Sequence, residues 1–374
     1  MTEYHGLGHF LLRSMKILID INHPAHVHYF KNFYKIMVDL GNEVLVVSRN
    51  KEIEHKLLTS YHIPYVSRGK GQSGKISKFL YMIYADVKIF LLALKFRPDV
   101  FLNFLHPYPS HVARLIGKPS LVFSDTEHAK LHHRLTVPFA TKVLTPSCYL
   151  IDLGKKQHRF NGYMELSYLH PKYFTPDPAI LNLLHVNESE KFVIFRFVSW
   201  KAAHDFGHNG MSLENKRKAV LELSKYARVF ISAEGELPRD LEKFRIAIPC
   251  HKMHDALYYS SLLFGESATM ASEAAVLGTP SVFMFNGVLG YTQEEEKKYN
   301  IVNNFTESEV DQALAIERAL EILQEEDGKA KYKAIGKSIV NNCVDTTAIM
   351  VEEVLKFNKN RRQQTSLLLA CGIC

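Results

Sequence analysis

Three histidines, His23, His26 and His28, lie within six residues of one another, directly after the first apolar run of the chain. Imidazole changes its protonation state near neutral pH, so it can transfer a proton, bind a phosphate or hold a metal ion. No cysteine or carboxylate cluster nearby completes a metal site, so none is predicted. We predict that His23 and His26 contact substrate and transfer protons, with packing or helix capping as the alternative, and that His28 lies inside the following helix.

A second polar segment, Ser124-Asp125-Thr126-Glu127-His128, follows another apolar run. Carboxylate and imidazole together suit acid–base chemistry, so Glu127 is predicted to be catalytic, with Asp125 and His128 binding substrate. The structural alternative is that Ser124 or Asp125 caps a helix that runs through His133, with Glu127 in its first turn. The two roles are compatible.

The segment 263–282 reads as the end of a strand, a turn of small residues, a helix that carries Glu273, then Gly278, Pro280 and a second strand. A parallel α/β sheet presents a helix N-terminus to an anionic ligand in this way. The segment therefore predicts a nucleotide site.

Two further loops carry polar residues. Gly69 to Lys75 has the spacing of a phosphate-binding P-loop, but Ile76 stands where a Ser or Thr should bind magnesium, so we reject that motif. The loop could still close over an acceptor. In the loop after residue 197, we predict that Ser199 contacts the nucleotide sugar, whereas the single Trp there is more typical of packing.

These residues are positioned by short β-branched runs that alternate with helical stretches, a pattern that predicts parallel sheets. We expect two Rossmann-like, doubly wound α/β domains that face a cleft, with C-terminal helices over 308–324 and 329–357. The predicted strands are 17–20, 43–47, 64–67, 99–104, 120–123 and 142–144 in the first domain, and 192–197, 228–232, 245–248, 262–264 and 281–284 in the second.

The domain boundaries follow from a proline-bearing stretch that interrupts this alternation. We predict a first Rossmann-like domain over 15–158, a linker over 159–178 and a second Rossmann-like domain over 179–358. The peripheral tails are 1–14 and 359–374.

The chain has 374 residues, 47% of them hydrophobic, a formal net charge of +7 and five scattered cysteines. No uncharged apolar run is long enough to cross a bilayer, and scattered cysteines indicate a reducing compartment, so a cytoplasmic protein is expected. The positive charge is compatible with phosphorylated substrates, nucleic acid or an anionic membrane surface.

The segment 76–96 alternates apolar clusters with Lys78, Lys88 and Lys95. It could be a cationic amphipathic helix that rests on anionic lipid, which would place the protein at the inner face of the membrane. The alternative is a long helix that buries one face on the sheet.

The two-domain arrangement resembles the GT-B glycosyltransferase fold, particularly the non-hydrolysing UDP-N-acetylglucosamine 2-epimerases. Residues 266–273, Glu-Ser-Ala-Thr-Met-Ala-Ser-Glu, keep the spacing of the epimerases' nucleotide motif, with Glu266 in place of Asp, and Ala268 and Thr269 in place of glycines. The resemblance implies that Glu273 binds the ribose hydroxyls, while Ser267 and the amides near Ala268 and Thr269 bind phosphate.

Three motifs together resemble the family called domain of unknown function 354: His-Pro-Ala-His at 23–26, Ser-Asp-Thr-Glu at 124–127 and Ser-Glu-Ala at 272–274. The resemblance covers nearly Met15 to Phe357 and implies the fold, whereas the family name states no activity.

The leading hypothesis is a glycosyltransferase that moves sugar from a nucleotide donor to a cell-surface glycan or lipid-linked acceptor. No metal, other cofactor or nucleic acid is expected to take part. The donor would bind Glu266, Ser267, Ala268, Thr269 and Glu273, and the acceptor would meet His23, His26 and Glu127. The alternatives are a nucleotide-sugar 2-epimerase, a non-catalytic nucleotide-sugar-binding protein and a polymer glycerophosphotransferase that depends more on histidine.

Overall fold

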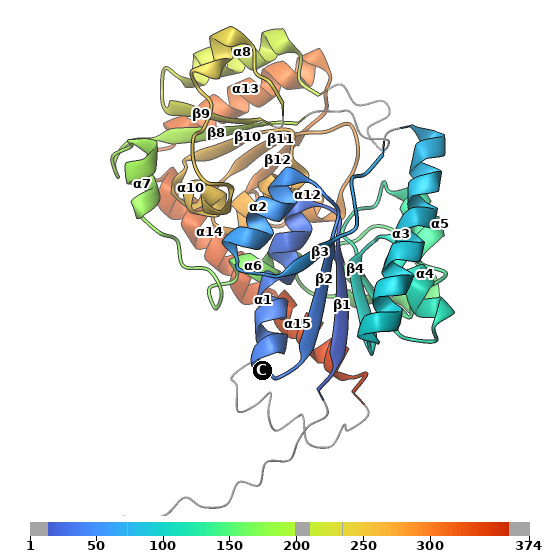
Figure 1. The fold of residues 1–374 in the computed structure, drawn as a ribbon. Helices are drawn as coiled ribbons and strands as arrows, with labels where there is room; N and C mark the ends of the chain where they lie inside the picture. Colours follow the sequence, from blue (N-terminus) through green and yellow to red (C-terminus); the bar gives the residue numbers. More distant parts are fainter. Residues whose placement is uncertain (1–13, 73, 199–209, 234, 359–374) are drawn as a thin grey trace, which may run out of the picture.

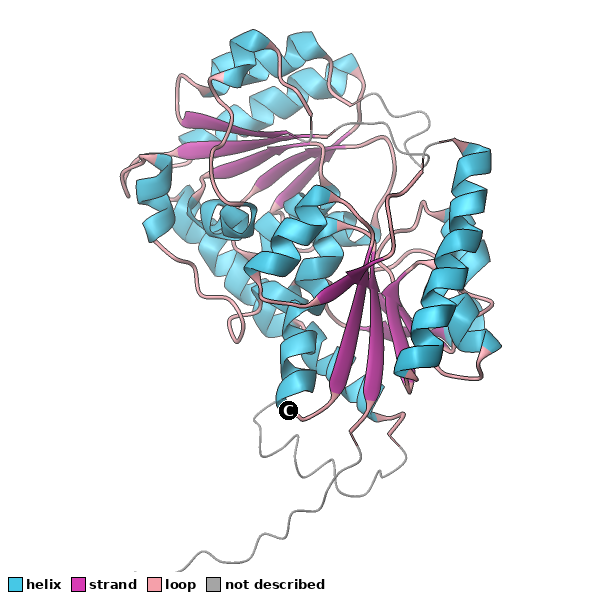
Figure 2. Ribbon diagram, viewed as in Figure 1, coloured by secondary structure: helices cyan, strands magenta, loops and turns pink. Residues whose placement is uncertain are grey.

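The computed structural model describes residues 14–72, 74–198, 210–233 and 235–358. Helices surround two sheets of seven and five strands, and every pair of neighbouring strands in them is parallel (Figure 1, Figure 2). The two parallel sheets confirm the predicted α/β class. We call the first sheet with its helices the first unit, and the second sheet with its helices the second unit.

The first sheet has the strand order β3-β2-β1-β4-β5-β6-β7. Its central strands are buried along their whole length, because helices cover both faces of the sheet. The strands are β1 (Lys16–Ile21), β2 (Glu43–Ser48), β3 (Tyr65–Ser67), β4 (Val100–Phe104), β5 (Ser120–Phe123), β6 (Lys142–Pro146) and β7 (Gln157–Phe160), and the helices are α1 (Pro24–Asp39), α2 (Glu52–Ser60), α3 (Lys75–Phe96), α4 (Pro107–Leu115), α5 (Lys130–Thr136) and η1 (Gly154–Lys156).

The second sheet has the strand order β12-β11-β10-β8-β9. Its strands are β8 (Phe192–Phe197), β9 (Arg228–Ala233), β10 (Leu262–Gly265), β11 (Ser281–Met284) and β12 (Val302–Phe305). Its helices are α8 (Leu213–Leu223), α9 (Arg239–Glu242), η2 (Cys250–Lys252), α10 (Met253–Tyr259), α11 (Ala268–Val276), α12 (Gly290–Lys297), α13 (Glu309–Gln324) and α14 (Gly328–Asn342).

Each sheet reverses its winding direction at one place, between β1 and β4 in the first and between β8 and β10 in the second. Ligands of such sheets bind outside the carboxyl ends of the strands at this switch point. The loops after β1 and β4 therefore form one candidate edge. The loop after β10, which leads into α11, belongs to the other.

The units are joined by α6 (Leu166–Leu169) and α7 (Ala179–Leu184), and the chain then returns through α15 (Thr346–Leu355) to pack on α1 and α6. The Lys142 ammonium lies 2.5 Å from the Glu353 carboxylate, which fastens α15 to β6. One cluster of buried apolar side chains runs through both units. The predicted domain limits stay a prediction. The strand β7 crosses the limit at residue 158, and α15, although inside the predicted second domain, packs on α1.

Most predicted strands are observed, but one predicted strand was wrong and two observed strands were not predicted. Residues 245–248 form only an isolated bridge, between Ile231 and Arg245. The strands β7 and β12 were not predicted, because Gln-His-Arg-Phe has a single apolar residue and Val-Asn-Asn-Phe has two asparagines, a residue type that is depleted in strands. These two segments form strands because they pair with the neighbouring strands β6 and β11, and not because of their own sequence preference.

Candidate functional site

The connection from β4 to α4 contains a strained residue at the carboxyl edge of the first sheet. Leu105 is buried and has a φ of 49°, a left-handed conformation that costs a residue with a Cβ about 1–3 kcal/mol. The next residue, His106, donates its backbone N–H to the side chain of Asn103 at 2.9 Å. Its Nε2 atom is buried and makes no hydrogen bond to any described residue. Strain beside an unpaired imidazole nitrogen indicates a functional loop, which the sequence analysis missed.

Four imidazoles gather at this edge. The His26 ring centroid lies 5.8 Å from that of His23 and 5.4 Å from that of His106, which is 5.7 Å from His132. Burial lowers the pKa of His26 and of His106 well below 6.5, and nearby histidine and arginine charges lower both further. Both rings are therefore neutral at pH 7, and each keeps one nitrogen as an acceptor. His23 also caps α1, because its Nδ1 accepts the N–H of Ala25 at 3.2 Å.

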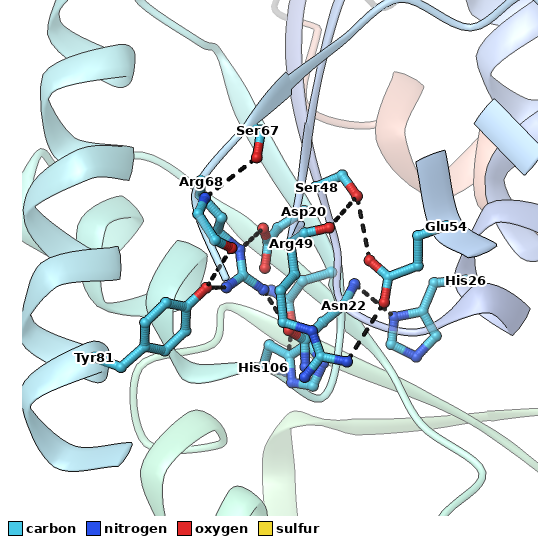
Figure 3. A network of polar contacts seen from close by, with 12 residues as sticks. Asp20, Asn22, His26, Ser48, Arg49, Glu54, Ser67, Arg68, Tyr81 and His106 are labelled. Atoms are coloured by element: carbon cyan, nitrogen blue, oxygen red, sulfur yellow. Dashed lines mark hydrogen bonds and ion pairs between the residues drawn. The ribbon is translucent and has the colours of Figure 1, made fainter. Parts of the chain in front are cut away.

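A fully buried arginine fixes the loop that carries these histidines. Arg68 Nε donates to Asp20 Oδ1 at 2.8 Å, its Nη1 to the Tyr81 hydroxyl at 2.6 Å and its Nη2 to Asn22 Oδ1 at 2.5 Å (Figure 3). The guanidinium also lies 4.9 Å from the centre of the Tyr108 ring. Burial raises the pKa of Asp20 although Arg68 opposes this. Arg68 thus connects the ends of β1 and β3 to α3.

A second ion pair extends the same network to the end of β2. Arg49 Nη2 lies 3.5 Å from Glu54 Oε1, and the Ser48 hydroxyl donates to Glu54 Oε2 at 3.2 Å (Figure 3). Burial raises the pKa of Glu54 to about 7, against the lowering effect of Arg49. The sequence analysis did not single out Arg49 or Glu54, because nothing in the local sequence shows that they meet.

Glu127 reaches across to the second unit. Its Oε1 accepts the N–H of Gly290, the first residue of α12, at 2.9 Å and that of Leu150 at 3.3 Å. Its Oε2 is buried and accepts no hydrogen bond from the described residues. Burial raises the pKa of Glu127 to about 7. A Cβ on Gly290 would lie 2.0 Å from the carbonyl oxygen of Cys148, so only glycine fits this contact.

The capping alternative for this segment was wrong. The helix begins at Lys130, with Ala129 at the cap position, so Glu127 precedes its first turn. The Ser124 hydroxyl instead accepts the N–H of Thr126 at 3.4 Å, which holds the segment in a turn. This turn is what directs the Glu127 side chain toward α12.

Five buried carboxyl groups lie where the two units meet, and we call them the interdomain carboxyl cluster: Asp125, Glu127, Glu165, Glu273 and Glu295. Burial raises the pKa of Asp125 to about 6 and that of Glu295 to about 8. The pKa of Glu165 is raised well above its usual value by burial, and further by Asp125 and Glu295. The sequence analysis missed Glu165 and Glu295, which lie far from the other three in the chain.

Asp125 also connects the cluster to the histidines. Tyr29 on α1 donates its hydroxyl to Asp125 Oδ2 at 3.3 Å, and the Tyr29 ring stacks on His26 with centroids 6.0 Å apart. Tyr29 therefore links Asp125 to His26.

In the second unit, α11 begins at the switch point of the sheet, directly after β10. Ser267 is the N-cap, and its hydroxyl accepts the N–H of Met270 at 3.4 Å. Ala268 and Thr269 follow in the first turn, where backbone N–H groups have no partner within the helix. A Cβ on Gly265 would lie 2.2 Å from the Arg196 carbonyl oxygen, so the turn before α11 requires a glycine.

Glu266 holds two neighbouring segments of backbone. Its carboxylate accepts the N–H of Val198 at 2.9 Å and that of Met211 at 2.6 Å, and it lies 3.0 Å from the Lys216 ammonium. Its predicted contact with the nucleotide sugar stays a prediction. Ser199, predicted to bind the same ligand, lies outside the described residues.

Glu273, on α11, points to the interface between the units. Its Oε1 accepts the Tyr168 hydroxyl at 2.6 Å and pairs with His254 Nε2 at 2.9 Å. The His254 ring meets the edge of His28 from the first unit, with centroids 4.6 Å apart. His28 lies inside α1, as predicted. His128, another residue predicted to bind substrate, packs against Phe285, which follows β11. Their ring centroids are 5.7 Å apart.

Within the part of the chain that the structure describes, no three His, Cys, Asp or Glu side chains form a group that could hold a metal ion.

Solved structures with the same architecture include nucleotide-sugar enzymes. The chain is similar to MnaA of S. aureus in complex with UDP, with a TM-score of 0.68 and 12% identity over 92% of this chain and 96% of that one. It is similar to UDP-GlcNAc 2-epimerase of Neisseria meningitidis bound to UDP-GlcNAc, with a TM-score of 0.67 and 13% identity over 91% and 100%. The chain is also similar to the glycosyltransferase VinC in complex with dTDP, with a TM-score of 0.61 and 13% identity over 92% of this chain and 100% of that one. At these identities the likeness shows the fold alone, which is GT-B-like.

Two sequence comparisons extend over most of the chain. A family model described as Protein of unknown function (DUF354) matches residues 15–359. An uncharacterized protein of Methanocaldococcus jannaschii is 25% identical over 284 residues, which are 72% of this chain and 81% of that protein.

Proposed function

The chain belongs to the DUF354 family, and from that premise we propose that it is a GT-B-type glycosyltransferase that uses a nucleotide-sugar donor. One observation carries the proposal: α11 opens its N-terminus at the switch point of the second sheet, while Glu273 on the same helix extends to the interface with the first unit. A diphosphate and a ribose need this combination of amide donors and a carboxylate. The nucleotides UDP and dTDP in two structural neighbours support the same ligand class.

On the donor side, Ser267 and the amides of Ala268 and Thr269 bind the diphosphate at the positive end of the α11 dipole. Glu273 accepts hydrogen bonds from the ribose hydroxyls. Its Oε1 already has two partners, whereas its Oε2 accepts no hydrogen bond from the described residues, which leaves one oxygen for the ribose.

On the acceptor side, the imidazoles of His23 and His26 bind the hydroxyl-bearing acceptor, and His106 joins them. Glu127 is the proposed base, because its Oε2 is unpaired and a pKa of about 7 suits proton transfer at neutral pH. Asp125 and His128 complete the sugar contacts. Oε2 is buried in this conformation, so the units must separate before the acceptor can reach it.

The reaction exchanges one bond at the anomeric carbon for another and moves one proton. The acceptor oxygen attacks the anomeric carbon of the donor sugar, and its proton passes to Glu127. The bond between that carbon and the diphosphate oxygen breaks, and the nucleoside diphosphate leaves with the electron pair. The α11 amides stabilise the charge that develops on it without a metal ion. We place this reaction in the cytoplasm, in the synthesis of a cell-surface glycan or glycolipid.

A nucleotide-sugar 2-epimerase is the second candidate, and one observation favours it. Asp125 and Glu127 are close in sequence, both buried, and have raised pKa values of about 6 and about 7. Two carboxyl groups poised near neutral pH can remove and return a proton at one carbon. A non-catalytic nucleotide-sugar-binding protein is the third candidate, and it would keep the α11 site without turnover.

The donor site is tested by thermal unfolding with UDP, GDP, CMP, dTDP and their sugars. A ligand at 100 times its Kd stabilises the native state by about 2.7 kcal/mol and raises the Tm by several degrees. Glu273→Gln should weaken binding roughly 10- to 100-fold, because a charged acceptor is lost. The exposed Glu317→Gln serves as the control. If no nucleotide raises the Tm, the donor site is wrong.

The candidates differ in turnover of the nucleotide that binds. A transferase releases nucleoside diphosphate only with an acceptor, whereas an epimerase changes the sugar without one and incorporates solvent deuterium into the ring. Glu127→Gln keeps an oxygen for the Gly290 N–H, so it should fold and bind the donor but lose transfer. Normal transfer by this variant would refute Glu127 as the base.

A further inference from the structure

One helix of the first unit has two apolar faces. The inner face of α3 contributes Tyr81, Ala85, Ile89 and Ala93 to the protein interior, at intervals of four residues. This confirms the structural alternative for the segment, a long helix that buries one face. A second apolar stripe lies on the opposite side of the helix, and its eight members are between 47% and 78% exposed: Ile76, Phe79, Leu80, Ile83, Tyr84, Val87, Leu91 and Leu94.

This outer stripe is continuous along the helix. Its members recur every three or four residues, so they share one side of a 22-residue helix that is about 33 Å long. Figure 1 shows α3 on the outside of the first unit beside α4 and α5, and no described helix or strand is drawn over its near side. Singly scattered apolar side chains need no explanation, but a continuous stripe of this length is typical of an interaction surface.

The charges around the stripe are positive. Lys88 and Lys95 flank it, and Lys78 is exposed near the start of the helix. The single acidic residue of α3, Asp86, lies 3.1 Å from His111 of α4, which is its ion-pair partner when protonated. Residues 75–134 contain nine Lys and Arg but four Asp and Glu, and Asp125 and Glu127 among these are buried.

We propose that the outer stripe of α3, defined by its eight exposed apolar residues, docks the protein on an anionic lipid surface. Apolar side chains with flanking lysines are the pattern of a helix that lies in the plane of the membrane interface. Pairing with a second copy is disfavoured, because it would bring like-charged Lys88 and Lys95 together without an acidic partner. None of the described helices has the length and apolarity to cross a membrane, and this contact requires none.

Docking would also orient the first unit. The N-terminal end of α3 is joined to the candidate edge through Tyr81, whose hydroxyl accepts from Arg68 at 2.6 Å. A lipid-linked acceptor could then pass from the membrane to the histidines of that edge. This last step rests on the proposed function, whereas the lipid contact does not.

The test is co-sedimentation of the full chain with vesicles of phosphatidylcholine alone and of phosphatidylcholine with phosphatidylglycerol. The protein should bind the mixed vesicles, and binding should weaken with added salt. The triple variant Leu80→Gln, Val87→Gln and Leu91→Gln should lower the affinity about tenfold or more. Lys88→Glu with Lys95→Glu should lower affinity for the mixed vesicles alone.

Matched controls come from the second unit. Leu221, Val310 and Leu314 are exposed apolar residues on α8 and α13, and changing all three to Gln should leave vesicle binding unchanged. The exposed Lys218 and Lys297 provide the charge control. Equal binding of the α3 triple variant and the native protein overturns the proposal. So does a native dimer that the triple variant converts to a monomer.

The two proposals fail separately. Thermal unfolding with the nucleotide tests the α11 site in the same variants, and the α3 triple variant should keep the full nucleotide-induced shift in Tm. Vesicle binding without any nucleotide response leaves the docking surface standing and removes the proposed function.

Discussion

The two units place their candidate sites at equivalent points of their sheets but build them from different groups. In the first unit, the edge consists of side chains: Arg68 compensates Asp20, and burial keeps the imidazoles of His26 and His106 neutral by lowering the pKa of each. In the second, the start of α11 offers backbone amides, and Glu273 provides the carboxylate. A site of amides suits an anion of fixed geometry, whereas a site of side chains can be fitted to a particular acceptor.

The largest expected effect comes from the buried charge that fixes the first edge. Arg68→Met should destabilise the fold by about 3–5 kcal/mol, because Asp20 is left buried without its partner. Urea unfolding measures the change. The exposed Arg217→Met, which also loses an aspartate partner, should change stability little. Equal effects of the two variants would mean that the first edge does not depend on its side-chain network.

The second effect concerns pH and α12, which packs against the second edge. Glu295 has a folded-state pKa of about 8, raised from 4.5, so the folded state favours its protonated form. Stability is therefore greatest below about pH 4.5 for this group and falls as pH rises to about 8. This fall in the free energy of unfolding is roughly 3 kcal/mol between pH 5 and pH 8, and Glu295→Gln should remove it.

Unfolding at pH 5 and at pH 8 measures this difference. The variant should gain far more stability over the native protein at pH 8 than at pH 5, and its amide oxygen can still accept the Ser272 hydroxyl. A gain of equal size at both pH values would contradict the titration of Glu295.

The third effect tests the contact between the two regions. Gly290→Ala should destabilise the protein by about 1–3 kcal/mol, because the added Cβ would meet Cys148 and Glu127. Gly235 has open space around it, so Gly235→Ala is the matched control. Thermal unfolding measures the Tm of both variants. Equal Tm values would show that the interface around Gly290 can move to accommodate the added Cβ.

The smallest effect separates capping from ligand binding at α11. Ser267→Ala should cost about 1 kcal/mol, the usual value for an N-cap, and weaken nucleotide binding. Ser308 caps α13 in the same way, with its hydroxyl accepting the N–H of Asp311 at 3.2 Å. Ser308→Ala should cost similar stability and leave nucleotide binding unchanged. Titration calorimetry on both variants measures that difference.

The sequence predicted the fold well because its strands are short β-branched or aromatic runs between helices. The failures were elements whose state depends on neighbours. Residues 245–248 look like a strand, but only Arg245 forms a bridge, whereas β12 pairs with β11 despite its two asparagines.

The candidate site was less predictable, because its contacts join distant parts of the chain. Glu127 was found from its place after β5, but its bond to Gly290 spans 163 residues. Arg68 lies just before the glycine-bearing loop, and only the structure shows it buried against Asp20. His106 follows the buried strand β4, a position that could have been noticed with the other strand ends.

The proposed function depends on a nucleotide that binds at the N-terminus of α11. Hydrogen exchange can be measured with and without the nucleoside diphosphate found in the thermal screen. We expect added protection in the segment 266–276, including the amides of Ala268 and Thr269, and loss of that protection in Glu273→Gln. Saturating nucleotide that leaves this segment unprotected, or that protects only the loops after β1 and β4, would contradict it.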